Sequence, residues 1–233
     1  MQNFCPKCGA AEGEFVKGFC KKCYLQDHKL IEIDKELGIE RCKRCNKIKL
    51  RGLWVTQSEG SLRELIESKI KVRELINPKI DLELEPKEDG TTKATVNVIG
   101  ELNNKPLKLS EEVLLKPKVV MCNNCSKIAG NYYESVLQLR FKEKPTEKEI
   151  NKKQDEVGRL LSYEKGSDSL AEIVNLVKEK NGFDAYIGSK RSGRIVAERL
   201  ARKYGSTITR SYKMKGVDKK GKPRKRFTYC VKV

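Results

Sequence analysis

The chain has 233 residues and is strongly basic, with 50 lysines and arginines against 32 aspartates and glutamates and a formal net charge of +18. Its hydrophobic content of 38% excludes an intrinsically disordered chain, and its length allows one large domain or two to three small ones. Such an excess of positive charge favours polyanionic partners, above all nucleic acid, through counterion release.

No stretch of about eighteen apolar residues occurs, which argues against a membrane-spanning helix. Met1 is followed almost at once by Cys5, without the apolar core that a signal peptide needs. We therefore expect a cytoplasmic protein that does not bind membranes.

Eight of the nine cysteines fall into four pairs, each with two residues between its members. This spacing lets one tight turn direct both thiolates at one ion, and two such turns complete a tetrahedral zinc site with no open position. Disulfides are disfavoured, because a chain without a secretory signal stays in a reducing compartment. The sequence therefore predicts two structural Zn²⁺ ions, held by Cys5, Cys8, Cys20, Cys23, Cys42, Cys45, Cys122 and Cys125.

Pairing the turns in chain order places the first four of these cysteines on one ion and the last four on the other, across a long insertion. An interleaved pairing remains open at this point. Cations beside the turns would offset the charge of the thiolates, namely Lys7, Lys21, Lys22, Lys43 and Arg44. The ninth cysteine, Cys230, lies in an alternating strand pattern and is expected in a core, whereas His28 is expected on the surface.

Residues 1–40 are predicted to form the first zinc module, and residues 41–130 a second zinc module with an insertion. Within the insertion, residues 61–77 read as a helix, because Ser61 and Glu64 have capping-box spacing and Pro78 follows its end. Residues 79–86 and 93–102 alternate in hydrophobicity around a turn-rich segment, which predicts a hairpin.

Residues 131–233 are predicted to form the C-terminal, RNA-binding domain. Its expected elements are a strand at 131–141, helices at 146–161 and 167–182, a strand at 183–189, a helix at 191–205 and strands at 207–218 and 222–233. The predicted fold class is α+β: N-terminal zinc-ribbon modules with an inserted αβ/hairpin module, followed by a C-terminal α/β sandwich domain with helices packed on one sheet.

Three features together resemble the nonsense-mediated decay protein three family, the nuclear export adaptors of the large ribosomal subunit. They are the four cysteine pairs with CPKCG at the start, YYESVLQLR after the last pair, and GFDAYIGSKRSGRIVAERLARKYG leading into RFTYCVKV. The resemblance implies a factor on the subunit-joining face of the large subunit during late maturation, touching rRNA and the anti-association initiation factor. Eukaryotic members add a β-barrel portion and a tail, so this sequence, which ends at Val233, resembles a short, archaeal type.

Two basic clusters are predicted to contact RNA. The first, at the start of a predicted helix where backbone N–H groups favour phosphate, contains Lys190, Arg191 and Arg194. The second, around the turn of the C-terminal hairpin, contains Lys213, Lys215, Lys219, Lys220, Lys222, Arg224, Lys225 and Arg226. Stacking on Phe4, Trp54, Tyr132 or Tyr133 is conceivable, but such side chains more often belong to a core and are not counted.

The sequence thus predicts a non-enzymatic ribosome-associated adaptor or assembly factor that binds the large subunit and takes no small-molecule substrate. No nucleophile with its base, acidic cluster or open metal position is visible in the sequence. The alternatives are a zinc-ribbon enzyme acting on nucleic acid, either a nuclease or an RNA-modifying enzyme, and a zinc-ribbon transcription factor.

Overall fold

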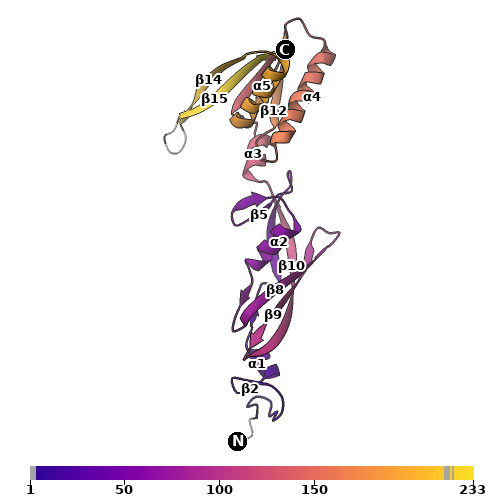
Figure 1. Cartoon of the computed structure of the whole chain (residues 1–233), viewed down its shortest axis with the longest axis vertical. Coiled ribbons are helices and arrows are strands. Elements are labelled where there is room, and N and C mark those ends of the chain that lie inside the picture. The colour runs from indigo at the N-terminus through magenta and orange to yellow at the C-terminus, as the bar shows by residue number, and fades with distance from the viewer. Residues whose placement is uncertain (1–3, 218–220, 222) are drawn as a thin grey trace. The chain divides into compact units, whose positions relative to one another are not determined.

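The computed structural model describes residues 4–217, 221 and 223–233. The chain divides into two compact units, Met1–Met121 and Cys122–Val233, and Figure 1 labels many of their helices and strands. Both units mix helices with sheets, as the predicted α+β class requires. No helix in the described ranges is long and apolar enough to cross a membrane.

The N-terminal unit begins with a small hairpin and a short helix, β1 (Phe15–Val16), β2 (Phe19–Cys20) and α1 (Lys21–Asp27). Lys17 and Gly18 both have positive φ, at 48° and 88°, which suits a two-residue hairpin turn. Strand β3 (Ile31–Glu32) follows and pairs with β7 (Lys71–Val72). Tyr24 of α1 is buried together with Leu102 and Leu107, so the first module shares its small core with the long hairpin of the unit.

A six-stranded sheet forms the body of this unit, in the order β6-β5-β4-β10-β9-β8. Its strands are β4 (Glu36–Cys42), β5 (Ile48–Leu50), β6 (Leu53–Val55), β8 (Ile76–Pro86), β9 (Thr92–Leu102) and β10 (Lys105–Val120). Strands β4 and β10 are parallel, and the other neighbours are antiparallel. The predicted hairpin is confirmed as β8 and β9, and the alternation that predicted it buries Ala94, Val96 and Val98 of β9.

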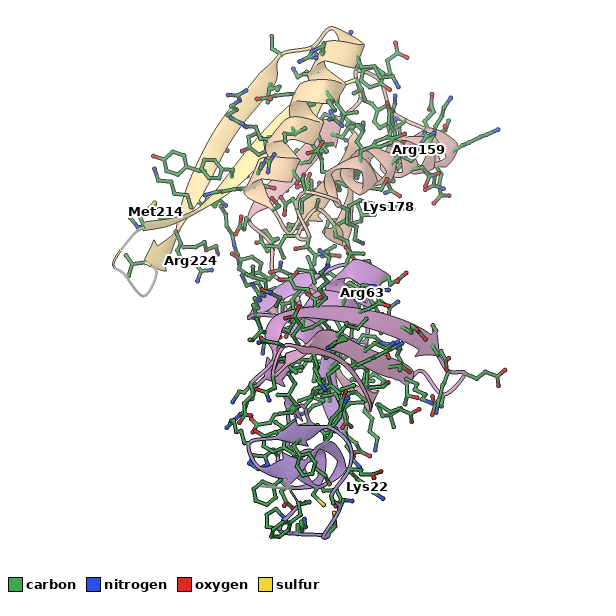
Figure 2. The ribbon with its side chains drawn as sticks, turned by 60° about the horizontal axis from the view of Figure 1, so that its bottom comes forward. Lys22, Arg63, Arg159, Lys178, Met214 and Arg224 are labelled. Atoms are coloured by element: carbon green, nitrogen blue, oxygen red, sulfur yellow. The ribbon has the colours of Figure 1, made fainter. Side chains whose placement is uncertain are left out.

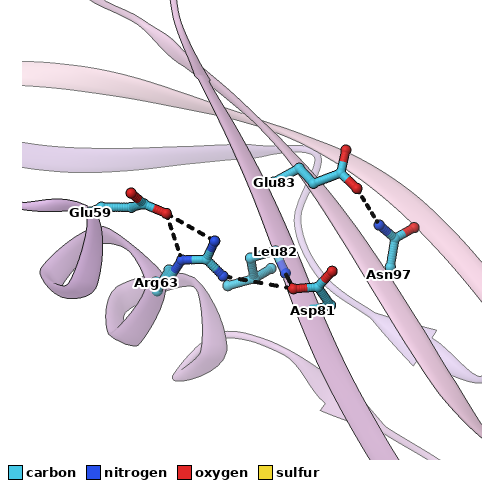
Figure 3. Close-up of polar contacts among 6 residues, drawn as sticks. All are labelled: Glu59, Arg63, Asp81, Leu82, Glu83 and Asn97. Atoms are coloured by element: carbon cyan, nitrogen blue, oxygen red, sulfur yellow. Dashed lines mark hydrogen bonds and ion pairs between the residues drawn. The ribbon is translucent and has the colours of Figure 1, made fainter.

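Helix α2 (Glu59–Glu67) packs on this sheet through Leu62, Leu65 and Ile66. Arg63 bonds Glu59 on the same helix at 2.9 Å and lies 3.9 Å from Asp81 on β8 (Figure 3). Both ion pairs are largely exposed and contribute little to stability. Burial of the two leucines and the isoleucine therefore holds the helix on the sheet.

The helix is shorter than predicted and starts earlier. Its N-cap is Ser58, which forms a reciprocal capping box with Ser61, so the predicted box of Ser61 with Glu64 is wrong. The helix ends at Glu67, and residues 71–72 and 76–86 are strands. The reason is a distant partner: Lys71 and Val72 pair with β3, about forty residues earlier, and β-branched Ile70 and Val72 pack against the same core from extended backbone.

The C-terminal unit contains one five-stranded sheet in the order β12-β13-β11-β15-β14. Its elements are α3 (Asn123–Ala129), β11 (Ser135–Arg140), α4 (Glu147–Glu164), β12 (Ile173–Glu179), β13 (Gly182–Ile187), α5 (Lys190–Tyr204), β14 (Ile208–Val217) and β15 (Pro223–Lys232). Helices α4 and α5 pack against one face of the sheet, as predicted. The helix boundaries also agree with the sequence: Thr146 and Glu149 form the predicted capping box, and Gly205 ends α5 with φ 58°.

The predicted helix over 167–182 is wrong, because residues 173–179 form strand β12. Leu170, Ile173, Val174 and Val177 have a helical spacing, but β-branched residues also suit a strand, and β13 provides an antiparallel partner. The Asn-Gly pair read as a helix C-cap lies instead at the β12–β13 hairpin: Asn181 is in its turn, and Gly182 begins β13 opposite Glu179. Gly182 has φ 147°, and a Cβ there would lie 1.9 Å from the carbonyl oxygen of Leu139.

We predict that Gly182→Ala destabilises the chain by about 3 kcal/mol, because the added methyl meets a backbone oxygen of the neighbouring strand. Gly205→Ala is the matched control, since its φ is also positive but nothing lies within 4 Å of the added atom. It should lose only about 1 kcal/mol. Urea unfolding of both variants measures the difference, and equal losses would contradict the close approach of Gly182 to the Leu139 carbonyl.

Candidate metal centres and nucleic-acid interface

The first group of cysteines is brought together by two separate turns. Cys5 and Cys8 lie on an N-terminal turn that is closed by a 2.8 Å bond from the Gly9 N–H to the Cys5 carbonyl, while Cys20 ends β2 and Cys23 lies in α1. The four sulfur atoms lie within 4.8 Å of one another, and the Sγ atoms of Cys8 and Cys20 are 3.6 Å apart. Tetrahedral Zn–S bonds of about 2.3 Å require sulfurs about 3.8 Å apart, so this donor set fits a zinc ion.

Electrostatics within this group also calls for a cation. The backbone N–H of Cys20 lowers the pKa of the Cys5 thiol to about 6, against burial that raises it. Hydrogen bonding to the Cys20 sulfur, together with burial, raises the pKa of Cys23 to about 12. Four such close thiols do not ionise together unless a cation offsets their charge, which is the role zinc plays in a four-cysteine site.

The second group contains Cys42, Cys45, Cys122 and Cys125, whose sulfur atoms again lie within 4.8 Å of one another. Parallel pairing of β4 with β10 places Val120 opposite Cys42, so the turns that follow these two strands leave the sheet at the same edge. Cys122 is the N-cap of α3, and its sulfur accepts the Cys125 N–H at 3.4 Å. Both groups follow the chain-order pairing, and each can hold one zinc ion.

Some of the cations expected to offset the thiolate charge are also paired with carboxylates. Lys7 lies 2.5 Å from Asp27, and Lys21 lies 2.8 Å from Glu14. Asp27 raises the pKa of Lys7, and the nearby thiolates of Cys23 and Cys5 raise it further. Lys7 is therefore held beside the first group by Asp27 as well as by the sulfurs, whereas Lys21 is held by Glu14.

We predict two zinc ions per chain by elemental analysis, and one ion after Cys8→Ser or Cys125→Ser. Each structural ion supplies on the order of 10 kcal/mol, so each substitution should unfold the surrounding segment as well. Cys230 is the control, because it lies on β15 outside both groups and Cys230→Ser should keep two ions. A wild-type chain with one ion would contradict the assignment.

The N-terminus of α5 is occupied by the protein's own acids. Ser189 is the N-cap, and the Asp168 carboxylate accepts hydrogen bonds from the hydroxyls of Ser189 and Ser192. The Lys190 N–H donates to Glu134 at 3.2 Å. The N–H groups of Lys190 and Ser192, two of the backbone donors expected to receive phosphate, thus already have partners in Glu134 and the Ser189 hydroxyl. Phosphate contact by the first basic cluster would therefore rest mainly on its side chains.

That first cluster is exposed, with its cations spread over one helical turn. Lys190, Arg191 and Arg194 are all solvent-accessible, and the Nε of Arg194 lies 4.0 Å from Glu198. Phosphate binding by these three side chains stays a prediction.

The pKa of Asp168 is shifted by its position at this helix end. Burial raises it, but hydrogen bonds from Ser189, Ser192 and the Leu170 N–H outweigh burial and hold the pKa below its usual value. A carboxyl with a depressed folded pKa adds stability that is complete above its unfolded pKa of about 3.9 and is lost as the pH falls through the folded pKa.

We therefore predict that Asp168→Asn lowers the free energy of unfolding by about 1 kcal/mol at pH 7, because Ser189 and Ser192 lose a charged acceptor. The difference from wild type should shrink below about pH 4. Urea unfolding at several pH values measures it, and since zinc loss at low pH affects both proteins, only their difference is compared. Asp155→Asn, at an exposed position of α4, removes the same charge and should leave stability unchanged at each pH.

The second basic cluster lies on a two-stranded arm, defined here as residues 213–217 of β14 and 223–226 of β15. The arm begins where the pairing of β15 with β11 ends, at Phe227. Figure 2 shows Met214 and Arg224 on this arm. Its described cations are Lys213, Lys215, Arg224, Lys225 and Arg226, and no described carboxylate forms an ion pair with them. The predicted residues Lys219, Lys220 and Lys222 lie outside the described residues.

The two sides of the arm differ in character. Lys213 pairs in register with Arg226, and Met214 pairs with Lys225, so lysine and arginine of the first pair share one side. On the other side, Met214 is 55% exposed, and Lys225 lies 4.3 Å over the ring of Tyr212. On the first side, Arg224 and Arg226 lie near the rings of Tyr132 and Tyr133, which the sequence alone did not favour as RNA contacts.

The remaining expectations from the sequence concern isolated side chains. His28 is exposed, as predicted, and its ring stacks on Tyr24 with centroids 4.1 Å apart. Cys230 is partly buried on the face of the sheet opposite α4 and α5. Of the two remaining aromatic candidates, Phe4 is 66% exposed and Trp54 is partly buried on β6.

Comparisons with known proteins cover nearly the whole chain. Residues 5–130 match the family model described as NMD3, N-terminal domain, and residues 132–233 match the family model described as NMD3, second domain. The comparison with curated proteins gives no match.

Proposed function

Because this chain belongs to the NMD3 family, we propose that it is a ribosomal-subunit adaptor that binds rRNA at the subunit-joining face of the large subunit during late maturation. The observation that carries the proposal is the match of both domain models, in order, over nearly the whole chain. A lone zinc ribbon would not carry it, since four-cysteine sites occur in many unrelated proteins.

The charge distribution supports an RNA partner. The chain carries a net charge of +18, and the arm concentrates cations that no described carboxylate neutralises. Neutralising phosphates with such cations releases counterions, which gives affinity without base recognition.

The zinc groups support a binding role rather than catalysis. Four thiolates fill a tetrahedral shell and leave no position for water or substrate. We accordingly propose a non-enzymatic protein of the cytoplasm whose partners are the large subunit, its rRNA and the anti-association initiation factor.

We predict that the protein cosediments with free large subunits and is scarce on small subunits and joined ribosomes. Replacing Lys213, Lys215 and Arg224 by Ser should weaken this association, because each lost phosphate contact flattens the plot of log affinity against log salt by about 0.7 to 0.9. Sedimentation of a lysate and salt-dependent binding to purified large subunits measure both effects.

The control removes three cations elsewhere. Lys148, Lys152 and Arg159 are exposed on α4, where Figure 2 labels Arg159, and their replacement by Ser should leave the salt slope unchanged. Equal recovery of wild type in every ribosomal fraction would contradict the proposal. Recovery away from ribosomes would favour a nuclease or a transcription factor instead.

A further inference from the structure

The sheet of the C-terminal unit has a second face that α4 and α5 do not cover. The helices pack against alternate residues of the three central strands, among them Leu137 of β11, Ala185 of β13 and Tyr229 of β15. The strand register turns the intervening residues to the opposite face, and these are Val136, Gln138, Asp184, Tyr186, Thr228 and Cys230. This second face is called the open face below.

Two tyrosines and an arginine meet at the end of the open face that adjoins the arm. The rings of Tyr133 and Tyr186 meet edge to face, with centroids 4.8 Å apart and planes at 88°. The guanidinium carbon of Arg226 lies 3.9 Å from the centroid of the Tyr133 ring. All three side chains are partly exposed, so they belong to neither a closed core nor a fully solvated surface.

These three residues come from different strands and are positioned by the sheet. Tyr133 precedes β11 by two residues, Tyr186 lies on β13, and Arg226 lies on β15, so the pair of strands beside β11 brings them together. A guanidinium stacked on a ring keeps its planar orientation and its outward donors. The cluster is therefore preorganised for flat ligands.

A third tyrosine, Tyr132, and a second arginine, Arg224, extend the cluster toward the arm. Arg224 lies 5.9 Å from the centroid of the Tyr132 ring and its Nη2 is 3.4 Å from the phenol oxygen. The Tyr132 hydroxyl donates to Glu134 at 2.8 Å, and Lys127 lies 5.2 Å from the ring centroid. Arg224 is exposed, so its outward donors face solvent.

The open face does not repel an anion at its centre. Asp184 is the acid that the three central strands place there, and Arg140 pairs with it at 2.6 Å. Gln138 donates to the same carboxylate at 3.0 Å. With this charge neutralised, the nearby cations Lys213, Arg224 and Arg226 dominate the field at the arm end of the face.

We propose that the open face binds an unpaired segment of RNA, with bases stacked on the cluster of Tyr133, Tyr186 and Arg226 and phosphates held by Lys213, Lys215 and Arg224. The inference rests on the proposed function and names the kind of RNA that this surface takes. An open sheet with partly exposed aromatic side chains and flanking cations is the arrangement that binds single strands, since unstacked bases offer their faces. Duplex RNA keeps its bases stacked and offers mainly phosphates.

The test uses the full, zinc-loaded chain and a fluorescently labelled ten-nucleotide oligouridylate, with a ten-base-pair RNA duplex as the comparison. Wild type should prefer the unpaired probe. Tyr133→Leu and Tyr186→Leu should each weaken its binding roughly tenfold, because a stacking surface is lost. The salt slope should stay unchanged in both variants, since no phosphate contact is removed.

Arg226→Lys separates stacking from charge. It keeps the cation but loses the planar guanidinium, so affinity should fall while the salt slope is kept. The matched control is Tyr163→Leu, because Tyr163 is 76% exposed on α4 and should keep wild-type affinity. Thermal unfolding and zinc content show that each variant is folded, and if Tyr186→Leu fails to fold, the other two variants carry the test.

Wild-type affinity in Tyr133→Leu and Arg226→Lys, or equal binding of duplex and unpaired RNA, would overturn the open-face proposal. Sedimentation separates this failure from failure of the proposed function. If wild type cosediments with large subunits but the variants keep their affinity for the oligouridylate, only the open-face site is refuted. If the chain binds unpaired RNA through the cluster but does not cosediment with large subunits, the open-face site is supported and the adaptor role is refuted.

Discussion

The parallel pairing of β4 with β10 is the contact on which the N-terminal unit depends. Residues 36–42 pair with residues 114–120, so this ladder closes a loop of about seventy intervening residues. The closure joins the hairpin of β8 and β9 to the short strands β5 and β6 in a single sheet. It also places Cys42 opposite Val120, so the two turns that carry the second cysteine group begin side by side. Loop-closure entropy of this size is offset when a metal fixes the ends of the loop.

A second constraint is the way the chain uses its acids. In the C-terminal unit, Asp168 and Glu134 occupy the N-terminus of α5, and Asp184 is neutralised by Arg140. These carboxylates satisfy buried or partly buried donors and so hold the fold together. The described part of the arm, by contrast, carries cations with no described carboxylate partner. Net charge alone did not reveal this division between paired acids and cations with no described carboxylate partner. The division depends on which carboxylates form hydrogen bonds and ion pairs within the fold.

The comparison of sequence with structure shows where local patterns suffice. The capping box of Thr146 and Glu149 and the stop at Gly205 were predicted correctly, because each involves residues within one or two turns of helix. The segments 68–77 and 167–182 were predicted wrongly as helix. Both have apolar residues at helical spacing, but each finds a strand partner, β3 or β13, that overrides the local preference.

The sequence by itself determined the eight zinc ligands and the basic character of the hairpin, since a spacing of two residues and a density of charge are local properties of the chain. It also carries the motifs that resemble those of the family. Only the tertiary structure decided which sulfurs share an ion, which helix end is already filled by acids, and which tyrosines lie together. Tyr133, Tyr186 and Arg226 are separated by about forty or more residues in sequence, and only the register of three strands brings their side chains into contact.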